Sequence, residues 1–365
     1  MDLLERVRQV AARGGDLSAV RAGLDQALRT SVVYDMAAIS TVDPATLLWT
    51  SCWVSGLSAD GEAEREQVLY ALEFAGDDLN SYTELANSGR LVGRLHQASG
   101  GDVRRARRWP ALLSQLGVTD EMRVILTSRD MVWGTLTLYR RAPHPPFTER
   151  DERVVRSALT AMADVFRLAM LRAALEMPAG LERPPGMVVV SPSGEIAAVS
   201  DSARTWLDAI DDRGRIPSVV RAIAAAVAAG DSLAHAAFPA PEGRWVMLHA
   251  SPLAGQAAGV GIIIEGAQPA RLSEVIAGAY GFTPREREIT ALTAQGRSTK
   301  QIALALGISP FTIQDHLKAV FAKVGVQSRA ELVATLYMQH YAPRRAAGAT
   351  PSPYGWYLDH YAAAS

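Results

Sequence analysis

The sequence predicts a multidomain α+β protein whose C-terminal part is a bundle of four short helices. Four helix starts, each with its own capping residues, follow one another between residues 282 and 332. Upstream, short runs of alternating apolar and polar residues are typical of paired strands, with helical stretches between them. A Pro-containing segment, Leu181–Pro185, separates these strands into two groups. At 365 residues, the chain is long enough for two or three domains.

Residues 1–178 are expected to form the first domain. A helix is predicted at 16–31 and a strand pair at 35–41 and 47–54. Several helices follow within 61–116, then a second strand pair at 121–127 and 132–140, and a long helix at 148–175. Arg129-Asp130, between the last two strands, is the pattern of a hairpin turn. Thr148 is expected to cap the long helix, with Asp151 three residues on.

This order of elements resembles a GAF sensory domain, and two motifs carry the resemblance. They are G-T-L-T-L-Y-R-R in the last strand and P-F-T-E-R-D-E-R-V-V at the start of the long helix. The resemblance implies a GAF-like α/β sensor with an unidentified small-molecule input, and a final helix that often pairs with its copy in a dimer. The apolar face of that helix is wide enough to contact both its own sheet and a partner helix. Neither the cysteine that anchors bilins nor the residues that mark cyclic-nucleotide binding are matched, so no cofactor is expected.

Four tryptophans of this domain are candidates for lining a ligand cavity: Trp49, Trp53, Trp109 and Trp133. Large aromatic side chains also fill ordinary cores, so the cavity and the plain core remain alternatives. Cys52 is expected to be a buried thiol rather than a redox switch, because no basic residue flanks it. The arginine-rich run at 104–108 is expected to be a solvated helix face, with a second nucleic-acid site as the alternative.

Residues 186–268 are expected to form a second, smaller domain. The run G-M-V-V-V-S-P-S-G-E-I-A-A-V-S-D-S-A predicts a strand, a turn, another strand and a helix start. Two more strands are predicted at 244–251 and 259–265. The layout resembles a small PAS-like α+β domain. Because it contains no distinctive cofactor residue, its expected role is mechanical coupling or dimerisation.

Residues 271–340 are expected to form the C-terminal domain. Each helix there begins at a hydroxyl residue that is followed by proline or, three residues on, by Glu or Gln; these residues are Thr283, Ser298, Ser309 and Ser328. Two helices separated by a short turn that contains glycine form a helix-turn-helix. Gly307 is expected to be that turn residue, with a positive φ angle, and Ser309–Val324 the recognition helix.

The recognition helix divides into two faces. Apolar residues three and four apart form the stripe expected to pack on the other helices: Ile313, Leu317, Val320 and Val324. The residues expected to point outward are Phe311, Gln314, Asp315, Lys318 and Ala322. In the major groove, Gln can pair with adenine, Asp can accept from cytosine and Lys can donate to guanine. Gln314, Asp315 and Lys318 are therefore the candidate base-reading residues, with an ordinary solvated face as the alternative.

This segment resembles the DNA-binding domain of LuxR-type transcription regulators. The matching motifs are T-P-R-E-R-E, S-x-K-x-I-A-x-x-L-G-I-S, T-I-x-x-H-L and K-V-G-V-x-S-R-A-E-L. The resemblance implies phosphate contacts at Lys300 and Thr312, and the further candidates for such contacts are Ser298, Thr299, Lys323 and Arg329. It also implies a dimer seam on the last helix, with the candidate residues Val333, Leu336 and Tyr337. The sequence departs from the family at Phe311, where a polar or basic residue is common, and at Gln314, where Lys is frequent.

Charge supports DNA binding only locally. The chain has 37 Lys and Arg against 38 Asp and Glu, so it has no general affinity for polyanions. The segment Arg271–His340 has eight basic and five acidic residues, a difference of +3 that leaves −4 for the rest. Such a small excess indicates that one module binds DNA weakly and that a homodimer engages two half-sites.

Several other classes of protein are disfavoured. No G-x-S-x-G, Walker, G-x-G-x-x-G or H-E-x-x-H run occurs, so an enzyme is not expected. With a single cysteine and scattered histidines, neither an internal disulfide nor a metal site is expected. No apolar run reaches the roughly 18 residues of a membrane span, and the N-terminus M-D-L-L-E-R-V-R lacks the apolar core of a signal peptide. We therefore expect a cytoplasmic protein without membrane contact.

The sequence thus predicts a dimeric transcription regulator that binds double-stranded operator DNA under the control of its N-terminal sensor, with RNA polymerase as a further candidate partner. The alternative from another class is a ligand-dependent sensor or scaffold whose C-terminal helices make protein contacts only. The tail at 341–365 contains aromatic residues that a disordered tail normally lacks: Tyr354, Trp356, Tyr357 and Tyr361. We expect it to dock on the body of the protein or on a partner.

Overall fold

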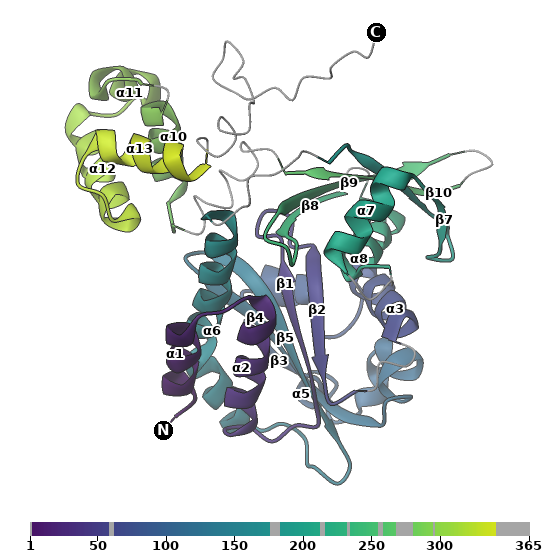
Figure 1. Cartoon of the computed structure of the whole chain (residues 1–365). Coiled ribbons are helices and arrows are strands. Elements are labelled where there is room, and N and C mark those ends of the chain that lie inside the picture. The colour runs from purple at the N-terminus through teal and green to yellow at the C-terminus, as the bar shows by residue number, and fades with distance from the viewer. Residues whose placement is uncertain are drawn as a thin grey trace. The chain divides into compact units, whose positions relative to one another are not determined.

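The computed structural model describes residues 2–57, 62–175, 183–211, 216–231, 234–254, 258–267, 280–294 and 296–340. The chain divides into two compact units, whose elements are labelled in Figure 1. The N-terminal unit comprises Met1–Met170 and Arg183–Gly266, and the C-terminal unit comprises Leu171–Glu182 and Ala267–Ser365. The two strand groups that the sequence predicts therefore share one compact unit. The predicted tail lies outside the described residues.

A five-stranded antiparallel sheet forms the first half of the N-terminal unit. Its strand order is β2-β1-β5-β4-β3, with bounds β1 Met36–Val42, β2 Trp49–Ser55, β3 Val92–Arg94, β4 Val118–Ser128 and β5 Met131–Arg141. Both predicted strand pairs are confirmed. Arg129 and Asp130 turn β4 into β5 with φ angles of 53° and 60°, the left-handed pair that a two-residue hairpin turn requires. The sequence does not predict β3, because a strand of three residues is too short to show a period.

The helices of this half are α1 Leu3–Arg13, α2 Leu17–Arg29, α3 Glu62–Ala75, α4 Tyr82–Asn87, α5 Leu95–Ala98 and α6 Glu149–Leu175, with short 3-10 and π-helical turns at Val103–Arg105 and Trp109–Leu113. On α2, Arg21 Nη2 donates to Thr41 Oγ1 of β1 at 3.2 Å. On β4, Ser128 Oγ donates to Asp164 Oδ1 of α6 at 2.6 Å. These contacts tie both helices to the sheet.

The long helix α6 begins as predicted, because Thr148 Oγ1 accepts from the Asp151 N–H at 3.3 Å. Its apolar side chains are covered by the chain itself: Val155, Met162 and Phe166 expose at most 1% of their surface. These three side chains of the apolar face are therefore packed against other residues of the same chain. These three positions offer no surface to a partner helix, whereas Val154 is half-buried, and the predicted pairing of α6 with its copy stays a prediction.

A second five-stranded antiparallel sheet forms the rest of the N-terminal unit. Its strand order is β7-β6-β10-β9-β8, with bounds β6 Gly186–Val190, β7 Ile196–Val199, β8 Ala234–Pro239, β9 Trp245–Leu253 and β10 Gly259–Gly266; the helices are α7 Asp201–Ile210 and α8 Ser218–Ala228. The four predicted strands are confirmed. The sequence does not predict β8 or α8, because runs of alanine show neither strand nor helix periodicity clearly.

Helix α8 packs on both halves of the N-terminal unit. Val220 and Ile223 lie in the core of the second sheet. On the other side of the helix, Ala222 is buried in one cluster with Trp49 and Tyr70 of the first half. The two sheets therefore share a hydrophobic contact through one helix.

Polar contacts reinforce this junction between the two halves. The buried Asp43 carboxylate, at the end of β1, accepts from the Ala237 N–H of β8 at 2.7 Å. Ser218 Oγ of α8 donates to Glu66 Oε1 of α3 at 2.7 Å. Because these groups are satisfied by each other, separating the halves would leave polar groups to be solvated as well as apolar surface.

The C-terminal unit contains the four predicted helices, α10 Pro284–Ala294, α11 Thr299–Leu306, α12 Pro310–Val324 and α13 Arg329–His340. At the start of α11, Ser298 Oγ accepts from the Gln301 N–H at 3.3 Å, and Gln301 Oε1 accepts from the Ser298 N–H at 2.8 Å. Gly307 has the expected left-handed conformation, with a φ angle of 67°. The core of the unit is formed by Ile289, Ile302, Ala303, Ile313 and Leu317. The predicted helix-turn-helix is confirmed.

Candidate functional site

The exposed face of α12 carries the three candidate base-reading residues. Gln314, Asp315 and Lys318 are exposed. Ile313 and Leu317, which alternate with them along the helix, expose at most 5% of their surface. The predicted division of the helix into a packed face and an outward face is therefore confirmed.

Two of these side chains form a surface ion pair. Asp315 Oδ1 and Lys318 Nζ lie 3.6 Å apart, and both side chains are 77% exposed. An ion pair at such exposure contributes at most about 1 kcal/mol. The pair therefore fixes neither side chain strongly.

The N-terminal ends of α11 and α12 carry part of the predicted phosphate-contacting set. Ser298 caps α11, Thr299 is half-buried and Lys300 is exposed. On α12, Thr312 Oγ1 lies 2.9 Å from Oγ of the capping residue Ser309. A helix N-terminus offers backbone N–H groups and partial positive charge to an anion. These positions suit phosphate contacts, which stay a prediction.

The other two residues of that set, Lys323 and Arg329, are engaged inside the unit. Lys323 Nζ forms an ion pair with Glu286, which also accepts from the Thr283 N–H at 2.7 Å. Burial acts to raise the pKa of Glu286, but Lys323 and Thr283 outweigh it and lower the pKa. Arg329 Nη2 donates to the Thr293 carbonyl at 3.3 Å. A phosphate contact by either cation would compete with these bonds, and it too stays a prediction.

The predicted dimer seam lies on α13. Val333 is half-buried there. The side chains of Leu336 and Tyr337 lie outside the described part of the structure. The seam therefore stays a prediction.

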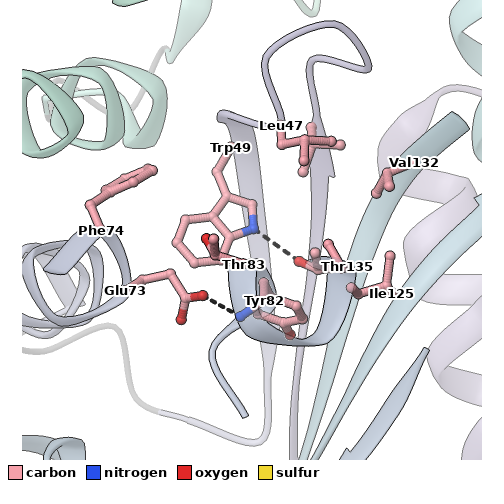
Figure 2. Close-up of a pocket in the computed structure, with 11 residues that line it drawn as sticks. Leu47, Trp49, Glu73, Phe74, Tyr82, Thr83, Ile125, Val132 and Thr135 are labelled. Carbon is pink, nitrogen blue, oxygen red and sulfur yellow. Dashed lines mark hydrogen bonds between the residues drawn. The ribbon is translucent and has the colours of Figure 1, made fainter. Parts of the chain in front are cut away.

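A cavity of ≈ 50 Å³ lies in the first half of the N-terminal unit (Figure 2). Residues of α3, α4 and four strands line it, among them Trp49, Phe74, Tyr82, Ile125 and Thr135. Trp49 Nε1 donates to Thr135 Oγ1 at 2.9 Å, and the Glu73 carboxylate accepts from the Tyr82 N–H, as the dashed lines show. The cavity thus combines aromatic and aliphatic walls with a few fixed polar groups.

The four tryptophans that the sequence singles out do not meet around this cavity. Among the described residues, Trp49 is the one of the four that lines it. Trp133 is fully buried elsewhere, and its Nε1 donates to the Ser128 carbonyl at 3.1 Å. Trp53 and Trp109 are half-buried. For Trp133 the plain-core alternative is therefore the correct one.

The volume of the cavity limits what it can hold. An engineered apolar cavity of about 150 Å³ takes a benzene molecule. A cavity of ≈ 50 Å³ therefore accommodates only a few non-hydrogen atoms unless a wall moves. Leu47 at the rim is 45% exposed and has a φ angle of 63°, a conformation that costs a leucine about 1–3 kcal/mol. Leu47 is therefore an exposed and strained part of the lining.

A chain of buried ion pairs, the buried ionic network, ends at this cavity. Arg108 contacts Asp78 at 2.7 Å and Glu121 at 2.9 Å, and Arg123 contacts Glu121 and, at 2.6 Å, Glu73. Each of the five side chains exposes 5% of its surface or less. Burial acts to raise the pKa of Glu121, yet the two guanidinium groups outweigh it and lower the pKa. The network holds α3 to the sheet behind the cavity.

Two predictions about this half need correction. The arginine run is not one solvated face: Arg104 pairs with Asp102 on the surface with 70% of its side chain exposed, whereas Arg108 is drawn inside by its two carboxylates. Cys52 is half-buried rather than buried. For Arg108 the deciding partners, Asp78 and Glu121, are distant in sequence, so the neighbouring residues give no sign of them.

Two family models match the sequence. The model of bacterial regulatory proteins, luxR family, matches residues 281–336, and the GAF domain model matches residues 27–165. Three proteins of Mycobacterium bovis and Mycobacterium tuberculosis are 48% identical over 52 residues, which cover 14% of this chain but only 6% of theirs. The spore germination protein GerE of Bacillus subtilis is 41% identical over 55 residues, 15% of this chain and 74% of that protein. Among solved structures, Escherichia coli SdiA is 14% identical, with 93% of this chain and 98% of that chain covered and a TM-score of 0.33.

Two further findings concern the described residues as a whole. None of their helices has both the length and the apolar composition that crossing a bilayer requires. Nor do their His, Cys, Asp and Glu side chains gather anywhere in a group of three or more that could hold a metal ion.

Proposed function

Since the chain belongs to the LuxR family of bacterial regulatory proteins, we propose that it regulates transcription by binding double-stranded operator DNA as a homodimer. The observation that carries the proposal is the exposed stripe of Gln314, Asp315 and Lys318 on the second helix of a helix-turn-helix, because that helix enters the major groove. The small positive charge of the C-terminal segment supports binding by two copies at two half-sites. A protein that binds operator DNA acts in the cytoplasm. RNA polymerase at the same promoter is its further candidate partner.

Replacing Gln314 or Lys318 by alanine is expected to weaken binding to a selected operator by about 1–3 kcal/mol. The loss on random duplex DNA should be smaller, because base contacts form only on the correct sequence. The measurement is duplex binding by the intact protein over a salt series, since phosphate contacts make affinity fall steeply with salt. Gln97→Ala, at an exposed glutamine of the N-terminal unit, is the control and should bind like the parent.

Two outcomes would contradict this assignment. Equal losses on operator and random duplex would show that the side chains contact only the DNA backbone. If the parent shows no salt-dependent duplex binding at all, the other class, a sensor or scaffold whose C-terminal helices bind proteins, is favoured instead.

We propose further that the cavity beside Trp49 is the input site of the GAF domain. Phe74 and Ile125 supply apolar contact, and the hydroxyls of Thr83 and Thr135 can form hydrogen bonds. Such a lining suits a small, largely apolar molecule with one polar group. A ligand can control DNA binding from this site only if it binds two arrangements of the protein with different affinities.

Replacing Ala86 by leucine is expected to exclude the ligand, because Ala86 lines the cavity and the added carbons occupy it. Native mass spectrometry of the intact parent should show a bound small molecule, and the same spectrum of Ala86→Leu should lack it. Ala71→Leu, at an exposed position of α3, is the matched control and should keep the added mass. The same added mass on Ala86→Leu would place the ligand elsewhere, and a parent without any added mass would argue against a tightly held input molecule.

A further inference from the structure

Phe311 is a large apolar side chain that the C-terminal unit leaves in water. It is 79% exposed, and among the described residues of that unit Leu304, at 86%, is the other large apolar side chain of this kind. A phenylalanine stabilises a folded protein by being buried. Packing within the unit therefore gives no reason for an aromatic ring at this position.

The position of Phe311 on α12 aligns it with the base-reading stripe. It is the second residue of the helix, and Gln314, Asp315 and Lys318 follow three, four and seven positions later, the spacing of a single helix face. In a helix-turn-helix, residues near the N-terminus of the recognition helix contact base edges. Phe311 therefore lies at the end of the stripe from which base contacts are expected.

The chemistry of phenylalanine limits what it can contact there. Its side chain has no hydrogen-bond donor or acceptor, so it pairs neither with a phosphate oxygen nor with the polar edge of a base. The one apolar group on the major-groove edge of DNA is the 5-methyl group of thymine, which phenylalanine is suited to contact. Gln314, one turn further along, is suited to adenine. Together the two residues fit neighbouring A·T pairs.

We propose that Phe311 is a specificity-determining residue that packs against the 5-methyl group of a thymine in the operator. The proposal rests on the proposed DNA-binding function and narrows its target to a duplex with thymine at a defined place in each half-site. It also accounts for the departure from the family at this position. A basic residue there would add affinity for any phosphate, whereas phenylalanine adds sequence preference without adding charge.

The test uses the intact protein and begins with selection of its preferred sequence from random duplexes. Each thymine of that sequence is then replaced by deoxyuridine, which lacks the methyl group and keeps every hydrogen-bonding group. For the parent, we expect one thymine in each half-site at which the replacement weakens binding about three- to fivefold, the effect of one buried methyl group. Phe311→Ala should bind the thymine site more weakly than the parent and should not distinguish thymine from uracil at that place.

Leu304→Ala is the matched control, because Leu304 is as exposed as Phe311 but lies on α11. It should discriminate against uracil as the parent does. If the parent selects a sequence but binds thymine and uracil sites equally, the role of Phe311 is overturned while DNA binding stands. The role is also overturned if Leu304→Ala and Phe311→Ala lose the discrimination alike. A parent that selects no sequence overturns the DNA-binding function and this proposal together.

Discussion

Replacing Arg108 by alanine is expected to lower the free energy of unfolding of the N-terminal unit by about 3–5 kcal/mol. The guanidinium lies 2.7 Å from Asp78 and 2.9 Å from Glu121, and all three side chains are almost fully buried. Without the Arg108 guanidinium, the carboxylates of Asp78 and Glu121 stay in a low-dielectric interior. The guanidinium of Arg123 then remains as a partner of Glu121. Urea denaturation followed by tryptophan fluorescence measures the loss, because six of the seven tryptophans precede residue 267.

Arg104→Ala is the matched control for this substitution. Its ion pair with Asp102 lies on the surface, where 70% of the arginine side chain is exposed, and exposed pairs contribute at most about 1 kcal/mol. If Arg108→Ala were no more destabilising than Arg104→Ala, the buried ionic network would contribute nothing beyond a surface pair.

The same network makes stability depend on pH. Burial acts to raise the pKa of Glu121 and of Asp78, but Arg108, together with Arg123 at Glu121, outweighs it, so both pKa values lie below the ordinary range. A carboxyl group with a lowered pKa in the folded state contributes stability that is complete above its ordinary pKa of about 4, and that is lost as the pH falls through the lowered value. The parent should therefore lose stability below about pH 4. Arg108→Ala should show a shallower decline, because the shift is smaller.

Replacing Ala222 by glutamate is expected to destabilise both halves of the N-terminal unit, by about 3 kcal/mol or more. Ala222 is 0% exposed and packs with Trp49 and Tyr70, so a carboxylate there is removed from water and placed against aromatic rings. Because α8 belongs to both halves, fluorescence and far-UV circular dichroism should report one shared transition at lower urea.

Ala228→Glu, at an exposed position of the same helix, is the control and should change stability by less than about 1 kcal/mol. Two separate transitions in the parent, of which Ala222→Glu shifted only one, would show that the two sheets fold independently.

Local chemistry explains which elements can be predicted from the sequence. A helix cap depends on residues three positions apart, so Ser298 with Gln301 and Thr148 with Asp151 define their helix starts without any knowledge of the fold. The faces of α12 follow in the same way from a period that the helix itself imposes. For this reason the outward face of the helix-turn-helix could be predicted residue by residue.

The cavity could not be predicted, because it is assembled by pairing between distant strands. Trp49, Phe74, Tyr82 and Thr135 come from four different elements, and none of them stands at a spacing that signals the others. Arg108 shows the same limit in electrostatics. Four arginines close together in sequence indicate a solvated face, and only the fold reveals that Asp78 and Glu121 bury one of them.

The contact of α8 with Trp49 and Tyr70 also bears on how regulators of this kind exchange their inputs. A gene fusion cut after residue 178, where the pattern of strands suggests that one module ends, would remove α8 and uncover the side of the aromatic cluster that packs on Ala222. Recombination that preserves this contact has to carry both halves of the N-terminal unit, Met1–Met170 and Arg183–Gly266, together. A larger side chain at Ala222 would have to be accommodated by changes in its aromatic neighbours, so substitutions in the two halves are expected to be coupled.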